Sequence, residues 1–159
     1  MQHKKVIEDI KFEIRKIEKL LEPYLALLKK VQDQEPDFIE LNALAMLLHS
    51  FYNGLENIFK QIARKIDGKI PYGEKWHIEL LDQMIKRTKN RNYKVLNENT
   101  CKYLRKYLGF RHFSRHAYSF DLNWELMKDL VLRIETIKTN VLNEIRTFIE
   151  NFKQNKIKE

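Results

Sequence analysis

The chain has 159 residues, of which 43% are hydrophobic, and this length suits a single domain with its own core. Its four glycines and three prolines are too few for a turn-rich β-sandwich or a glycine-rich nucleotide-binding fold. The single cysteine, Cys101, excludes an intrachain disulfide framework, and the net charge of +8 at pH 7 favours a polyanionic partner.

Apolar residues recur every three or four positions through the first half of the chain, which is the spacing of amphipathic helices. This pattern predicts a first helix over about residues 4–32, ended by a polar run that contains Pro36. A second helix is predicted over about residues 38–66. The stretch 67–73 contains glycines and a proline and should be a turn, followed by a short third helix over about residues 75–87.

The second half of the chain is predicted to hold two more helices. Asn97 or Asn99 can cap a fourth helix after a polar loop, and Gly109 is expected to bend or interrupt that helix. Asn123 can cap a last, long helix that ends near Phe152. No segment shows the alternating pattern of a β-strand.

These elements predict an all-α fold, an antiparallel bundle of about five helices. We expect one helical domain over residues 1–152 and a basic, disordered tail over residues 153–159. The sequence shows neither a signal peptide nor an apolar run long enough to cross a bilayer. We therefore expect a cytoplasmic protein with no membrane partner.

Positive charge is concentrated in one stretch, residues 86–115, which holds ten lysines and arginines but a single acid, Glu98. That stretch carries a net charge of +9 and the rest of the chain −1. Tyrosines and phenylalanines are interleaved with these cations, a combination that suits RNA or DNA. The alternative is a basic helix face that is simply exposed to solvent.

The most informative motif lies at the end of this stretch, where Arg111, His116 and Tyr118 form the pattern R-x4-H-x-Y. Histidine can accept the proton of a ribose 2′-hydroxyl or protonate a leaving 5′-oxygen. Arginine can hold the phosphate and stabilise charge on its oxygens. Since both Arg111 and His116 are assigned to the reaction, we expect neither side chain to be needed for packing. Helical positions five apart differ by about 140°, so the two side chains meet only if the helix loosens near His116. One histidine serves one role at a time, which favours a symmetric dimer.

Residues 111–118 resemble the signature of the HEPN superfamily, and specifically of HepT-like toxins paired with a minimal nucleotidyltransferase (MNT) antitoxin. Three further stretches resemble the same family, namely residues 50–59, 76–81 and 124–125. The resemblance covers residues 4–152, and its order of elements agrees with the helices predicted above.

The resemblance implies the toxin of a type VII toxin–antitoxin system. Such a protein would be a homodimeric, metal-independent RNA endonuclease without a cofactor, leaving a cyclic phosphate and cutting transfer RNA near its 3′ end. Arg111 and His116 match the catalytic pair. Tyr118 matches the tyrosine to which the partner nucleotidyltransferase attaches AMP, which silences the toxin. His112 stands where the commonest form of the signature has asparagine.

Several other residues are candidates for lining the cleft or binding RNA: His112, Arg115, Asn53, Glu56, Arg105 and Lys106. The alternative for the cations is ordinary solvated charge, and for Asn53 and Glu56 a structural hydrogen bond. His112 and His116 have the spacing of zinc ligands on a helix, but no cysteine or paired acid accompanies them, so we expect no metal site. His49 and His77 are expected to be surface or capping residues.

A second class of function is a catalytically silent helical module that binds a nucleotide or a partner and works with a nucleotidyltransferase. The intact set of Arg111, His116 and Tyr118 favours the nuclease, because a binding module would not need these three residues.

Overall fold

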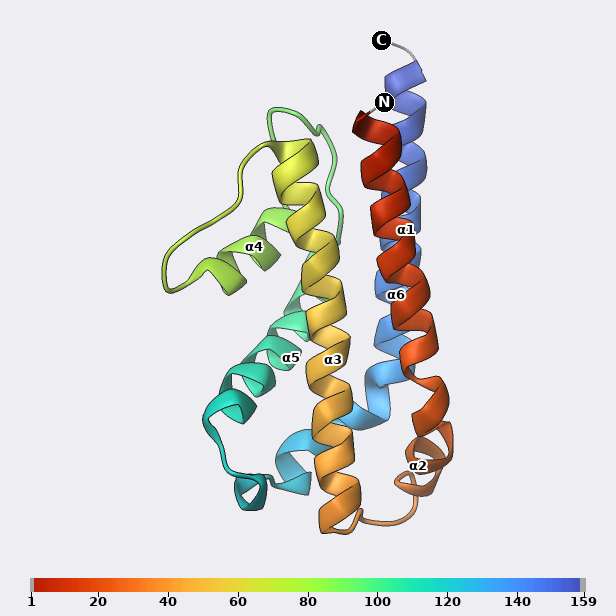
Figure 1. Cartoon of the computed structure of the whole chain (residues 1–159), viewed down its shortest axis with the longest axis vertical. Coiled ribbons are helices and arrows are strands. Elements are labelled where there is room, and N and C mark those ends of the chain that lie inside the picture. Colours follow the sequence, from red (N-terminus) through yellow and green to blue (C-terminus); the bar gives the residue numbers. More distant parts are fainter. Residues whose placement is uncertain (1, 158–159) are drawn as a thin grey trace.

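A computed structural model describes residues 2–157, and these fold as an all-α bundle around one central helix, α3 (Figure 1). No β-strand occurs over this range, and none of its helices is long and apolar enough to cross a lipid bilayer. In chain order the elements are α1 (Gln2–Leu20), the 3-10 turn η1 (Glu22–Tyr24), α2 (Leu25–Lys30), α3 (Phe38–Ile62), the π-helical turn η2 (Ala63–Asp67), α4 (Trp76–Met84), α5 (Glu98–His116), the 3-10 turn η3 (Ser119–Asp121) and α6 (Trp124–Ile157).

Helix α3 contacts α1, α4, α5 and α6, and its apolar residues form the centre of the core. It runs antiparallel to α1 and parallel to α6, which lie on one side of it in Figure 1, whereas α4 and α5 lie on the other. An ion pair between Glu18 and Arg146 also joins α1 to α6. The predicted all-α bundle is confirmed, and the long helices α1 and α3 pack antiparallel as expected of neighbours along the chain.

The prediction of one first helix over residues 4–32 is wrong in one respect. The structure has two helices there, since α1 ends at Leu20 and α2 begins at Leu25. Pro23 lies in η1 at this break. Proline has no backbone N–H to donate, and its ring clashes with the preceding turn, so a proline inside a helix kinks or breaks it. The apolar spacing continues across the break, with Leu21 and Leu28 both buried, which is why periodicity alone suggests one helix.

The predicted helix starts agree well with the structure. The Asn97 side chain accepts a hydrogen bond from the amide of Thr100, as expected of the residue that caps α5. Asn123 accepts one from the amide of Glu125 at the start of α6. The interruption expected at Gly109 is absent, since α5 is continuous through it. A glycine lowers helix stability by only about 1 kcal/mol, which the packing of α5 on α3 and α6 offsets.

The disordered tail predicted over residues 153–159 stays a prediction, although its first part is helical in the structure. Helix α6 continues to Ile157, and residues 158–159 lie outside the described part of the chain. Phe148 and Phe152 stack near the end of α6, and His3 of α1 packs edge-on against Phe152. Once a helix is anchored in this way, each further residue adds a hydrogen bond at little cost, so the helix extends past its last buried position.

Glycine at position 54 allows α1 and α3 to pack closely. A Cβ atom on Gly54 would lie 2.8 Å from Cγ1 of Ile17, closer than real Cβ contacts. A glycine at this position therefore lets the two helices approach more closely than an alanine would allow.

One member of the basic stretch has a structural role instead of an RNA-facing one. Arg91 is only 2% exposed, and its guanidinium donates to both carboxylate oxygens of Asp67, at 2.9 and 2.8 Å. It also donates to the carbonyl oxygens of Lys86, Tyr93 and Gln83. This buried pair ties the loop between α4 and α5 to the end of η2, so Arg91 does not contribute to a basic surface.

Candidate active site

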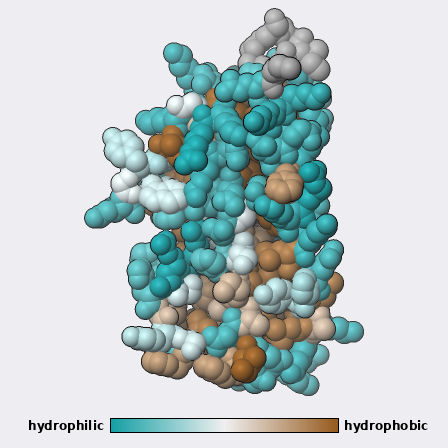
Figure 2. All heavy atoms as spheres, in the orientation of Figure 1, coloured by the Kyte–Doolittle hydropathy of each residue, from teal (hydrophilic) through white to brown (hydrophobic). Residues whose placement is uncertain are grey.

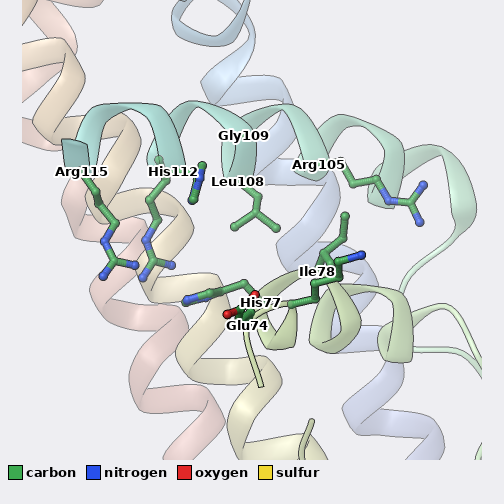
Figure 3. Close-up of a pocket in the computed structure, with 10 residues that line it drawn as sticks. Glu74, His77, Ile78, Arg105, Leu108, Gly109, His112 and Arg115 are labelled. Atoms are coloured by element: carbon green, nitrogen blue, oxygen red, sulfur yellow. The ribbon is translucent and has the colours of Figure 1, made fainter. Parts of the chain in front are cut away.

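A hollow of about 290 Å³ lies between the second half of α5 and the start of α4 (Figure 3). We call it the Arg111 hollow. Figure 3 shows His112 and Arg115 on the side of α5 that faces His77 and Glu74. Cationic and imidazole groups surround its apolar floor, and its lining residues are Glu74, Lys75, His77, Ile78, Arg105, Leu108, Gly109, Arg111, His112 and Arg115.

A buried carboxylate beneath this hollow holds two of its functional groups. Glu56 of α3 is fully buried, and its Oε1 accepts a hydrogen bond of 2.9 Å from Nη1 of Arg111. Its Oε2 lies 2.7 Å from Nδ1 of His77. Nζ of Lys60 lies 3.9 Å from Oε1. A carboxylate taken out of water needs such partners, because an unpaired buried charge costs several kcal/mol, on the order of 3–5.

The guanidinium of Arg111 is positioned by this carboxylate and by an aromatic ring. Arg111 is 8% exposed, and its Cζ lies 5.9 Å from the centre of the Tyr52 ring. Among the described residues, its Nε is buried without a hydrogen-bond partner and its Nη2 has no acceptor. The expectation that Arg111 plays no part in packing is therefore wrong. It is an ion-paired, buried arginine whose remaining donors lie beside the hollow.

His116 lies apart from Arg111. It is the last residue of α5, it is exposed, and it does not line the Arg111 hollow. Its ring packs edge-on against His112, with the two ring centres 5.6 Å apart. Because α5 stays helical through His116, the angular offset between positions 111 and 116 is retained. Within one protomer the two predicted catalytic side chains do not converge.

Tyr118 lines a second hollow of about 330 Å³, formed by the start of α3 and the chain that follows α5. We call it the Tyr118 hollow. The tyrosine is 71% exposed and stacks on Phe120 with ring centres 5.2 Å apart. Arg115 lines both hollows and so lies between the motif arginine and the motif tyrosine.

His49 also lines the Tyr118 hollow, which the sequence did not suggest. Burial lowers the pKa of His49, and the positive charges of Arg111 and Arg115 lower it further. In its buried position a protonated imidazole would be poorly solvated, and the two arginines would repel its positive charge.

The remaining predicted residues contribute unequally to the candidate site. Arg105 lines the Arg111 hollow but is ion-paired with Asp82. Lys106 is exposed, lies over the ring of Tyr103 and lines neither hollow. Asn53 is exposed and has no side-chain hydrogen bond to the described residues. Glu56 therefore contributes to the site, whereas Asn53 does not in a single protomer.

His77 is the site residue that the sequence analysis missed. It is not a surface or capping residue, because its ring lines the Arg111 hollow and binds Glu56. One signal was available in the sequence. Glu56 is an acid among apolar residues of a buried helix, and such an acid requires cationic or imidazole partners from elsewhere in the chain. Which residues they are depends on how α4 packs on α3.

Comparison with known proteins identifies the family. A family model described as HepT-like protein matches residues 43–152, which is more than half of the chain and includes α4, α5 and nearly all of α3. No curated protein and no solved structure gives a significant match. HepT-like proteins are toxin-type members of the HEPN superfamily and are generally nuclease-like. On this match and on the all-α architecture, the chain belongs to the HepT-like family of the HEPN superfamily.

Proposed function

We propose that this chain is the ribonuclease toxin of a type VII toxin–antitoxin pair, and that it cuts RNA, specifically transfer RNA near its 3′ end, without a metal ion. The observation that carries the proposal is the environment of Arg111. A buried, oriented guanidinium with unused donors lines a basic hollow that also contains two imidazoles. Such a site suits a phosphodiester, because the cations hold the phosphate and the imidazoles can move protons.

The proposed reaction is an internal transesterification. The 2′-oxygen attacks the adjacent phosphorus after giving its proton to a base, and the bond from phosphorus to the 5′-oxygen breaks. The 5′-oxygen leaves with a proton, so the products are a 2′,3′-cyclic phosphate and a 5′-hydroxyl. We assign the phosphate to Arg111 and one of the two proton transfers to His116. Preorganised charge at the phosphate is the larger contribution in such reactions.

The exposure of His116 supports a shared cleft between two copies of the chain. His116 does not reach the Arg111 hollow of its own protomer, so we propose that it reaches the active site of a homodimer. Figure 2 shows apolar atoms gathered at the lower end of the molecule, where α3 begins and η3 lies. The exposed apolar residues of these segments are Phe38, Ile39, Met46 and Phe120. An exposed apolar surface of this kind is typical of a protein–protein interface, and we propose that a second copy of the chain covers it.

We further propose that a cognate MNT-type nucleotidyltransferase silences the toxin by attaching AMP to Tyr118. The phenol is exposed and therefore accessible to a second enzyme. Arg115 lines the hollows of both Tyr118 and Arg111, so a phosphate attached to the tyrosine would meet a cation that RNA also needs. Like-charge repulsion would then oppose the binding of an RNA backbone.

Induced expression in bacteria tests the nuclease. Wild-type chain should arrest growth and cut RNA in the presence of EDTA, and His116→Ala should lose about 100-fold or more of its activity, the usual cost of losing a proton-transfer group. His3→Ala is the matched control, because His3 packs against Phe152 on α6 and not near the site. A strict requirement for a divalent metal would contradict the mechanism. Wild-type chain that binds RNA or a nucleotide but never cuts would instead support the binding-module alternative.

Tyr118→Phe tests the control by AMP. This change removes the acceptor hydroxyl and keeps the ring, so the variant should stay toxic when an active nucleotidyltransferase is coexpressed. Intact mass and peptide mapping of the wild-type chain should place the added AMP on Tyr118. An unshifted mass, or AMP on another residue, would refute this assignment and leave the nuclease untouched.

A further inference from the structure

We infer that His77 is a second catalytic histidine, which donates the proton to the leaving 5′-oxygen from within the same protomer as Arg111. The inference rests on the proposed RNA cleavage and adds a residue that the signature motif does not contain. It addresses a gap in the reaction, since two proton transfers are needed and one histidine serves one of them at a time.

The ring of His77 is fixed by two contacts. Its Nδ1 lies 2.7 Å from Oε2 of Glu56, and its ring stacks on Trp76 with centres 3.6 Å apart and planes 30° from parallel. Trp76 is itself covered by Nζ of Lys60, which lies 4.9 Å from the centre of a Trp76 ring. The imidazole is therefore held in one orientation, and the side chain is 22% exposed at the edge of the hollow.

The contact with Glu56 determines which nitrogen is available for chemistry. An ionised carboxylate only accepts hydrogen bonds, so Nδ1 of His77 is the nitrogen that carries the hydrogen in this contact. Nε2 has no hydrogen bond to the described residues and is left to serve the hollow. An imidazole acts as an acid from the form in which both ring nitrogens carry hydrogen, so the hydrogen on Nε2 is the one that His77 can give.

The same carboxylate places His77 beside the phosphate-binding group. Oε1 of Glu56 accepts from Arg111 and Oε2 faces His77, so the guanidinium and the imidazole are held on the two oxygens of one side chain. A phosphate bound by Arg111 would therefore lie next to His77. In the reaction the base takes the 2′-hydroxyl proton, the bond between phosphorus and the 5′-oxygen breaks, and Nε2 of His77 gives its proton to that oxygen.

The substitution His77→Asn separates this role from a structural one. The amide nitrogen of asparagine can occupy the place of Nδ1 and donate to Glu56, but the variant has no group in the place of Nε2. We expect cleavage of RNA to fall about 100-fold or more, with an unchanged thermal midpoint and unchanged binding of an uncleavable 2′-O-methyl RNA. His3→Asn makes the same chemical change far from the hollow and should cleave normally. If His77→Asn cleaves as fast as the wild-type chain, the inference is wrong.

A modified substrate then tests the direction of the proton transfer. The probe is a short RNA that contains the linkage cut by the wild-type chain, made with oxygen or with sulfur at the bridging 5′ position. A thiolate leaves without needing a proton, so sulfur should restore His77→Asn to within about tenfold of wild type, since a leaving group of low pKa gains little from an acid. It should not restore His116→Ala, if His116 serves as the base. Equal defects on both substrates would overturn the assignment of His77 as the acid.

The two proposals fail in different ways. If the wild-type chain cuts no RNA, the proposed function fails. If the wild-type chain cuts both probes but His77→Asn shows no selective loss on the oxygen probe, the proposed function survives and only the role of His77 is refuted.

Discussion

Replacing Arg111 should destabilise the fold as well as inactivate the site, because its partner carboxylate is buried. The Glu56 side chain is 1% exposed, and Arg111→Met would leave it with His77 at 2.7 Å and Lys60 at 3.9 Å. Removing one member of a buried ion pair costs about 3–5 kcal/mol. Two partners remain, so we expect the lower end, about 3 kcal/mol of the free energy of unfolding. For a domain of this size that lowers the thermal midpoint by roughly 6–12 °C.

A double variant shows whether the buried charge is the cause. Adding Glu56→Gln to Arg111→Met removes the buried charge that has lost its arginine and keeps the side-chain volume. The double variant should therefore recover about 2 kcal/mol relative to Arg111→Met, within the range seen for contacting residues. Urea unfolding followed by circular dichroism, at one fixed protein concentration, measures these differences. The matched control is Arg133→Met, which breaks an exposed pair with Asp129 and should change stability little. Full stability of Arg111→Met, or strictly additive losses in the double variant, would refute the reasoning.

Three further predictions concern stability and can use the same unfolding assay. Gly54→Ala should lower stability by about 1 kcal/mol or more, since the added Cβ would lie 2.8 Å from Ile17. This overpacking outweighs the better helix propensity of alanine. Unchanged stability would mean that α1 moves away freely. Gly109→Ala should raise stability by about 0.5–1 kcal/mol, because nothing lies within 4 Å of the added Cβ; a loss there would contradict the open space. His49 has a lowered pKa in the folded chain, so the unfolded chain binds its proton first, and stability should fall as the pH drops below about 6.5. His49→Gln should show a smaller fall between pH 7.5 and 5.5, and an equal fall would show that other groups are responsible.

Much of the fold could be predicted from the sequence because helix signals are local. Asn97 and Asn123 cap helices with their own side chains, and apolar spacing marks the buried faces wherever the helix is regular. The break at Pro23 was also a local signal, but buried leucines on both sides of it continue the apolar spacing and hide it. Continuity through Gly109 depends instead on the neighbours of α5, which no local rule describes.

The candidate site was less predictable, because its key contacts join residues far apart in the chain. Arg111, His112, Arg115 and Arg105 lie on one helix, and spacing alone could place all four near one face. Glu56 could be recognised as an acid in a buried helix, but its partners come from α4 and α5 and follow only from tertiary packing.

The buried Asp67–Arg91 pair has a consequence for proteolysis. The loop between α4 and α5 exposes Lys86, Arg87 and Lys89, which are sites for trypsin, and it has almost no regular secondary structure. A protease needs several residues to detach into an extended strand before it can cut. That detachment would break the five hydrogen bonds that Arg91 donates. It would also separate the buried charges of Arg91 and Asp67, whose side chains are 0% and 1% exposed. The loop should therefore resist cleavage until the neighbouring helices open, and tryptic nicking at these sites would report that opening.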